Sequence, residues 1–145
     1  MLNILVIGSG AREHAIVRSL CGSSKKKEIY CLATNYNPGI AQVCKDISVA
    51  DINDPETVKI YAKKKKIDFA IIGPENPLAN GVADALFDIG VESVGPKKDL
   101  AQIETSKSFT RNLLTEYKIP GCPKFKTFSS MEGVEEFLGE LGDYY

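Results

Sequence analysis

Apolar residues come in short runs that alternate with amphipathic segments along the first hundred residues of the chain. The runs lie at about residues 2–7, 28–33, 44–49, 67–72 and 91–94, and most are rich in β-branched side chains. Such runs are typical of strands that are covered on both faces of a parallel sheet. The segments between them carry apolar positions at helical spacing. This alternation predicts an α/β fold built on a doubly wound parallel sheet.

Local signals mark the ends of several predicted helices. Asp54 followed by Pro55 predicts the cap and the first position of one helix. Pro77 is expected to open another helix, which Gly90 ends, and its apolar positions follow helical spacing at Leu78, Val82, Leu86 and Ile89. Residues 34–40 are polar and contain Asn37-Pro38-Gly39, so we expect a loop there.

The pattern changes after residue 96. We expect a short linking helix at about residues 97–104, and a further helix that Ser106 caps and that ends before Pro120. Residues 124–128 are predicted to form a strand, and Ser129 with Glu132 has the spacing of a capping box for a last helix. These elements are too few to cover one another. They either begin a second domain or dock on the first domain as a carboxyl-terminal extension.

The first apolar run ends at a glycine turn with the sequence Gly8-Ser9-Gly10-Ala11-Arg12-Glu13. The glycines allow close backbone approach, and the free N–H groups of the following helix make the turn a ready anion site. A dinucleotide fingerprint needs a third glycine, where this chain has Glu13, and an acid after the second strand, where it has Thr34-Asn35-Tyr36. The turn therefore argues against a nicotinamide site. Arg12 and Glu13 are either aimed at a small charged ligand or form a solvated pair.

Three further loops are expected at the same edge of the sheet as this turn. The carboxyl ends of parallel strands gather at one edge, where open α/β sheets bind ligands. The pattern therefore predicts a pocket built from four loops, at Gly8–His14, Asn37–Gly39, Glu75–Leu78 and Gly95–Pro96.

Composition narrows the possible classes of protein. A hydrophobic share of 43% and a charged share of 26% are ordinary for a globular protein, and a net charge of −1 gives no reason to expect nucleic acid or an anionic membrane as partner. No apolar run approaches the ~20 residues that span a bilayer, and Met1 leads directly into a strand, so no signal peptide fits.

Metal and disulfide chemistry are not expected. The four cysteines show neither CxxC nor metal-ligand spacing, and His14 is the single histidine, so a histidine-based metal site is not expected. Reduced cysteines make the cytoplasm the simplest location.

Four motifs, taken together, resemble the amino-terminal part of the glycinamide ribonucleotide synthetase family. Its members are ATP-grasp ligases of purine synthesis and are also called phosphoribosylamine–glycine ligases. The order and spacing of the motifs agree over essentially all 145 residues. They are Gly8-Ser9-Gly10-Ala11-Arg12-Glu13-His14-Ala15, Ile72-Gly73-Pro74-Glu75-Asn76-Pro77-Leu78 with Gly81-Val82, Gly95-Pro96, and Glu104-Thr105-Ser106-Lys107-Ser108-Phe109.

The resemblance implies a Rossmann-like pre-ATP-grasp domain at residues 1–100 and the beginning of an ATP-grasp domain at residues 101–145. The parent enzyme would join glycine to 5-phosphoribosylamine with ATP and Mg²⁺, giving glycinamide ribonucleotide, ADP and phosphate. Family members run to roughly three times this length. The chain would then lack most of the ATP site and the Mg²⁺ ligands, and by itself it would not catalyse the reaction.

The resemblance also assigns roles to residues. The glycine turn and Arg12 would recognise an anion, Glu75 would hydrogen-bond ribose hydroxyls or orient the amine, and Lys107 would reach the ATP phosphates. For Lys107 the alternative is a surface lysine, and for His14 a satisfied helix histidine. The full set of expected substrate-binding residues is Gly8, Gly10, Arg12, Glu13, His14, Asn37, Gly39, Glu75, Pro77, Leu78, Gly95 and Pro96. Residues 34–40 and Asn76 depart from the family pattern.

Two other readings remain open at this point. One is a sibling ATP-grasp ligase, such as a purine carboxylase or a biotin carboxylase. The other is a stand-alone ligand-binding module with a Rossmann-like sheet and no chemistry. The encoded sequence beyond Tyr145 would separate them, because a ligase continues into a strand with a lysine and a glycine-rich loop. The sequence specifies no oligomeric state.

Overall fold

The computed structural model describes residues 1–142 of the chain. They belong to two compact units, which are divided between Thr105 and Ser106. The expected linking helix, observed as α6 (Lys98–Thr105), belongs to the first unit. The assignment of the two units to two functional domains stays a prediction.

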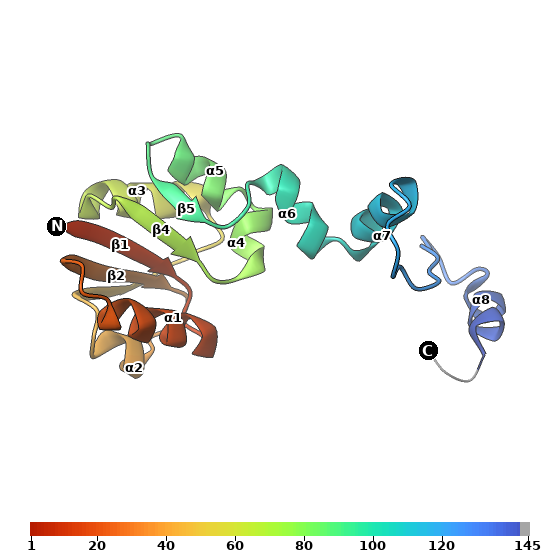
Figure 1. Ribbon diagram of the computed structural model, residues 1–145, viewed down its shortest axis with the longest axis horizontal. Coiled ribbons are helices and arrows are strands. Elements are labelled where there is room, and N and C mark those ends of the chain that lie inside the picture. Colours follow the sequence, from red (N-terminus) through yellow and green to blue (C-terminus); the bar gives the residue numbers. More distant parts are fainter. Residues whose placement is uncertain (143–145) are drawn as a thin grey trace. The chain divides into compact units, whose positions relative to one another are not determined.

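The first unit is a five-stranded parallel sheet with helices on both faces (Figure 1). The strands are β1 (Leu2–Ile7), β2 (Lys27–Ala33), β3 (Asp46–Val49), β4 (Phe69–Ile72) and β5 (Glu92–Val94), in the order β3-β2-β1-β4-β5. The α/β prediction is confirmed. The chain adds strands on one side of β1 and then on the other, so the topological switch point lies between β1 and β4.

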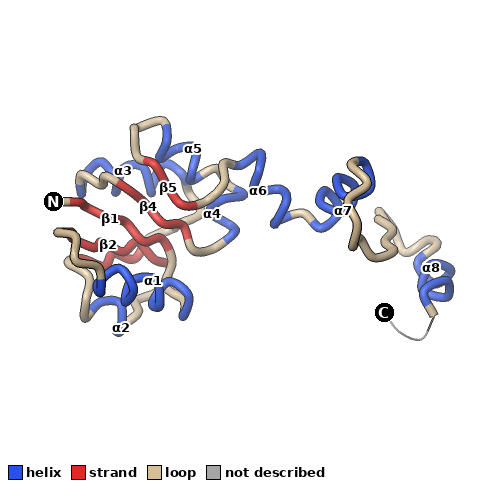
Figure 2. The backbone as a smooth tube through the Cα atoms, viewed as in Figure 1, coloured by secondary structure: helices blue, strands red, loops and turns tan. Residues whose placement is uncertain are grey.

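Helices cover both faces of this sheet, as the blue helices around the red strands in Figure 2 show. One face carries α1 (Ala11–Gly22) and α2 (Pro38–Ala41), and the other carries α3 (Pro55–Lys65) and α5 (Val82–Phe87). The short helix α4 (Glu75–Ala79) follows β4 and packs against α6.

Alternation along β1 explains why both faces are apolar. Leu5 and Ile7 pack into the cluster that includes Val58 of α3, whereas Val6 packs with Val17 of α1 on the opposite face. Successive side chains of a strand point to opposite faces, so a strand buried on both sides must be apolar throughout. This is why the short runs in the sequence located the strands.

Two predicted features of this unit change in the structure. The single helix expected from Pro77 to Ile89 is two helices, because Gly81 adopts a left-handed φ of 88° between α4 and α5. The first of these two helices, α4, begins at Glu75, before Pro77. The loop expected at residues 34–40 contains α2, which the Asn37 side chain caps. The cap predicted at Asp54 is confirmed, since its carboxylate accepts hydrogen bonds from the first turn of α3.

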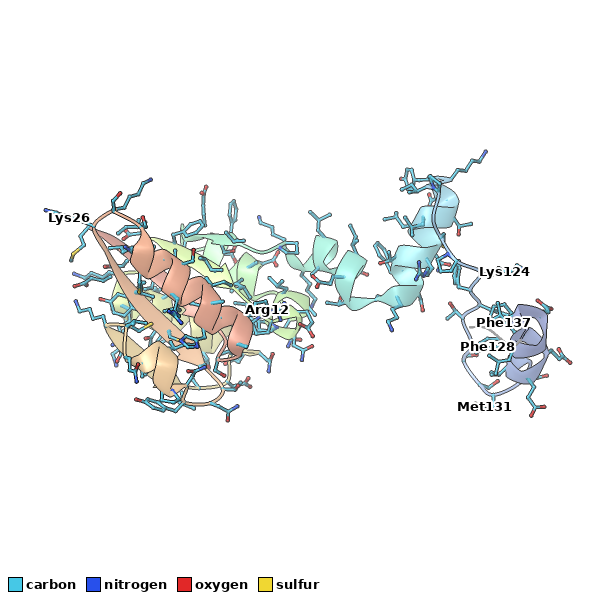
Figure 3. The ribbon with its side chains drawn as sticks, turned by 60° about the horizontal axis from the view of Figure 1, so that its bottom comes forward. Arg12, Lys26, Lys124, Phe128, Met131 and Phe137 are labelled. Atoms are coloured by element: carbon cyan, nitrogen blue, oxygen red, sulfur yellow. The ribbon has the colours of Figure 1, made fainter. Side chains whose placement is uncertain are left out.

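The second unit contains α7 (Lys107–Glu116) and α8 (Val134–Leu141), and Ser106 caps α7 as predicted. The prediction of a strand at residues 124–128 is wrong. A strand needs a hydrogen-bonding partner, and the described part of this unit offers no other strand to pair with. The capping box at Ser129 is also wrong: α8 begins after Gly133, which has a φ of 76°. The rings of Phe128 and Phe137 pack 5.9 Å apart (Figure 3).

Hydrophobic residues of this second unit stay at least partly exposed wherever the structure describes them. This agrees with the expectation that these elements are too few to cover one another. Within residues 1–142, no helix combines the length and the apolar content that crossing a membrane requires. All four cysteines are free thiols.

Candidate functional site

The glycine turn after β1 holds the side chain of Glu13. This residue lies in the first turn of α1, and it is the one charged residue buried among the described residues, with 4% of its surface exposed. Its Oε2 accepts a hydrogen bond from the Gly10 N–H at 2.6 Å. Glu13 therefore caps its own helix, because its carboxylate accepts the N–H group of the N-cap residue Gly10 in the glycine turn.

Three glycines make room for the Glu13 side chain. A Cβ at Gly8 would lie 2.8 Å from its Cγ, a Cβ at Gly10 would lie 2.9 Å from its Oε2, and a Cβ at Gly73 would lie 2.1 Å from its Oε1. Gly8 follows β1 and Gly73 follows β4. The carboxylate thus fills the space at the switch point of the sheet. Gly73 was missed as a site residue, although its place directly after an apolar run was the available signal.

Arg12 and Glu75 lie across the switch point from one another. Arg12 Nη2 is 3.8 Å from Glu75 Oε2, and Arg12 Nε is 3.3 Å from Glu13 Oε1. Among the described residues, Glu13 Oε1 makes this ion-pair contact but accepts no hydrogen bond. The side chains of Arg12 and Glu75 are 61% and 53% exposed. Two loops that the sequence placed at one edge of the sheet are therefore joined by a solvent-accessible ion pair. Figure 3 shows Arg12 at the start of α1.

The loop after β2 is tied to the same turn. Asn37 Nδ2 donates a hydrogen bond to the Ser9 carbonyl at 2.9 Å, while its Oδ1 accepts from Gly39 N–H at 2.9 Å. The His14 ring lies over Gly39, where a Cβ would come within 2.5 Å of its Cε1. Asn37, Gly39 and His14 thus form a second group beside the turn, and the hydrogen bonds of Asn37 hold the two loops together.

Three of the remaining predicted residues, Pro77, Leu78 and Gly95, are packed close to one another or into the core. Pro77 and Leu78 are buried. A Cβ at Gly95 would lie 2.7 Å from Leu78 Cδ2, and Gly95 has a φ of 144°, so close packing and backbone conformation both require glycine there. Pro96 is exposed.

Lys107 belongs to the second unit and lies exposed in the first turn of α7. It lines a pocket of about 430 Å³ together with Ser108, Arg111 and residues 125–128. Arg111 and Lys126 bring two further cations to this pocket, and the sequence analysis missed both. The available signal for Arg111 was its spacing, because residues four apart share one face of a helix.

Among residues 1–142, no three His, Cys, Asp or Glu side chains gather in a way that could hold a metal ion. The ion-paired groups at the sheet edge are one guanidinium and two carboxylates, of which the Glu13 carboxylate is buried.

Comparisons with known proteins agree on one family. The family described as phosphoribosylglycinamide synthetase, N domain, matches residues 2–104. The phosphoribosylamine–glycine ligase of Methanococcoides burtonii is 44% identical over 141 residues, which are 97% of this chain and 33% of the ligase. The ligase of Methanopyrus kandleri is 46% identical over 143 residues, which are 98% of this chain and 32% of that protein. The chain thus spans about a third of the length of these curated relatives.

A solved structure shows the same fold. N5-carboxyaminoimidazole synthetase from Staphylococcus aureus, determined in complex with ADP, matches with a TM-score of 0.74 at 14% sequence identity. The match covers 97% of this chain and 36% of that one.

Proposed function

We propose that this chain, which belongs to the phosphoribosylglycinamide synthetase N-domain family, is the amino-terminal part of a phosphoribosylamine–glycine ligase. The parent protein joins glycine to 5-phosphoribosylamine, and it converts ATP to ADP and phosphate. The support is an identity of 44–46% to curated ligases over nearly the whole chain. The chain spans about a third of those proteins, and in this proposal it supplies part of the active site of the parent.

The observation that carries this proposal is the Arg12–Glu75 pair at the switch point. Open α/β sheets bind ligands at this place. In the proposal, the Glu75 carboxylate accepts hydrogen bonds from the ribose hydroxyls or the amine of 5-phosphoribosylamine, and Arg12 donates to an oxygen of the same sugar. Holding a labile amino sugar in this way places its amine for attack on the glycyl acyl phosphate.

The second unit contributes to the ATP site in this proposal. Residues 101–145 begin the ATP-grasp domain, and Lys107, Arg111 and Lys126 offer cations to the nucleotide phosphates. The Staphylococcus aureus protein of the same fold was determined with ADP, which supports a nucleotide site in the parent. The Mg²⁺ ligands come from the rest of the parent protein. The proposed location is the cytoplasm, and the partners are the small-molecule substrates, with no nucleic acid and no membrane.

Steady-state kinetics of the full-length parent test the proposal. Arg12→Ala and Glu75→Ala each remove a charged hydrogen-bonding group, so we expect kcat/KM for 5-phosphoribosylamine to fall about tenfold or more. The KM for ATP should change little in both variants. Lys107→Ala should have the opposite selectivity, raising the KM for ATP most.

The matched control is Arg18→Ala, which removes an exposed arginine of the same helix and should leave all three KM values unchanged. Equal losses toward glycine, ATP and the amino sugar in the three variants would refute the proposed roles. An inactive wild-type parent would refute the function itself.

A further inference from the structure

We propose that the Glu13 side chain fills the crevice at the switch point and keeps phosphate groups out of the glycine turn. Arg12 and Glu75 are then the side chains that contact the ligand. The proposal starts from the geometry of one side chain. Glu13 is 4% exposed, its Oε2 accepts the Gly10 N–H at 2.6 Å, and its Oε1 points at Gly73.

In a dinucleotide fingerprint the first two glycines let the backbone approach a pyrophosphate, which takes the free N–H groups at the helix start, and the third glycine lets the helix pack on the strand. This chain keeps Gly8 and Gly10 but has Glu13 at the third position. The larger residue fits because Gly73, on the neighbouring loop, lacks a side chain where Oε1 lies. The Gly10 N–H, which an anion held in this turn would need, is thus already taken by the Glu13 carboxylate.

The ion-pair contacts at the turn join Arg12, Glu13 and Glu75, which are one basic and two acidic side chains. The single guanidinium is shared between two carboxylates. A phosphate placed at Gly10 would meet the Glu13 carboxylate at contact distance in a setting that screens charge less than water does. The turn therefore disfavours anions and suits hydroxyl or amine groups.

The orientation of the substrate at this turn rests on the proposed function. If the ligand is 5-phosphoribosylamine, its ribose or amine end lies at the Arg12–Glu75 pair, and its phosphate points away from the glycine turn. This replaces the expectation from the sequence that Gly8 and Gly10 bind the anionic end. The phosphate-binding cations of the parent then belong to other elements.

Nuclear magnetic resonance titration of the 145-residue chain with sodium pyrophosphate, at constant pH and ionic strength, tests the exclusion of phosphate. In the wild type, the amide signals of Gly8 and Gly10 should show no saturable shift at millimolar pyrophosphate. Glu13→Gly, which restores the third glycine, should produce saturable shifts at both amides and bind at least about tenfold more tightly.

The matched variant is Glu13→Gln, which keeps the volume and a hydrogen-bond acceptor but removes the charge. We expect the Gly10 amide proton to move upfield in this variant, because a charge-assisted bond becomes an ordinary one, while the turn stays closed to pyrophosphate. That signal reports the Glu13–Gly10 bond directly and does not depend on stability.

Saturable wild-type shifts at Gly8 and Gly10 would overturn the proposal, and so would a folded Glu13→Gly protein that gains no pyrophosphate binding. If Glu13→Gly does not fold, the wild-type titration and the Gly10 signal of Glu13→Gln decide the outcome. A wild-type chain that excludes pyrophosphate, combined with a parent that is inactive on 5-phosphoribosylamine, would retain this inference and remove the proposed function.

Discussion

Replacing Gly73 by alanine tests whether the switch point is packed around Glu13. The added Cβ would lie 2.1 Å from Glu13 Oε1 and 2.6 Å from its Cδ and Cγ. These separations are far below van der Waals contact, so the Glu13 side chain or helix α1 must move. Gly73 is absent from the positive-φ glycines, so the backbone accepts alanine and the effect isolates the side-chain contact.

The expected cost follows from two alternatives. If Glu13 swings out, the protein loses a charge-assisted hydrogen bond to Gly10, which is worth about 1.5–3 kcal/mol. If α1 shifts instead, overpacking costs about 1–3 kcal/mol. Because neither relaxation is complete, we expect the free energy of unfolding to fall by about 3 kcal/mol. For a unit of this size, that lowers Tm by roughly 10–20 °C.

Urea and thermal unfolding, followed by circular dichroism, provide the measurement. The decisive comparison is a double-mutant cycle that combines Gly73→Ala with Glu13→Ala. Without the carboxylate, Gly73→Ala should lower the free energy of unfolding by under about 1 kcal/mol, so the coupling energy between the two positions should be about 2 kcal/mol or more. The matched control is Gly22→Ala in α1, where an added Cβ meets no atom within 4 Å. It should change stability by at most about 1 kcal/mol. An equal cost of Gly73→Ala with glutamate or alanine at position 13 would refute the packing argument.

Two further predictions concern stability away from the site. Asp54→Ala removes the acceptor for two first-turn amides of α3, so urea unfolding should show a loss of about 1 kcal/mol, and Asp54→Ser should recover most of it. Hydrogen bonding from Lys65, and then from Tyr61, holds the pKa of Asp46 below the ordinary range of a carboxyl group. The stability from this ionised group is therefore present above about pH 4 and is lost as the pH falls through the lowered pKa. The Asp46→Asn variant should be less stable than the wild type by up to about 1 kcal/mol at pH 7. The urea midpoints of the variant and the wild type should converge as the pH is lowered toward about 2. A difference that stays constant with pH would contradict this reasoning.

Much of the fold was readable from the chain because its signals are local. The apolar runs marked all five strands of the sheet. In the inner strands β1 and β2 the runs are longest, because a strand buried on both faces must be apolar throughout, whereas the edge strands β3 and β5 stay partly exposed. Asp54 and Ser106 were recognised as caps because a cap satisfies N–H groups only two or three residues away. The gathering of the loops that contain Arg12 and Glu75 followed from the parallel arrangement of the strands.

Long-range contacts were not readable in this way. Residues 124–128 have the side chains of a strand, but a strand needs a hydrogen-bonding partner, and the described part of the second unit provides none. The third position of the glycine turn looked like a departure from a fingerprint, and nothing near Glu13 in the sequence showed where its carboxylate lies. Its burial depends on Gly73, which lies on another strand's loop, 60 positions further along. Only folding brings these two residues into contact, and that contact makes Glu13 part of the interior rather than a side chain aimed at a ligand.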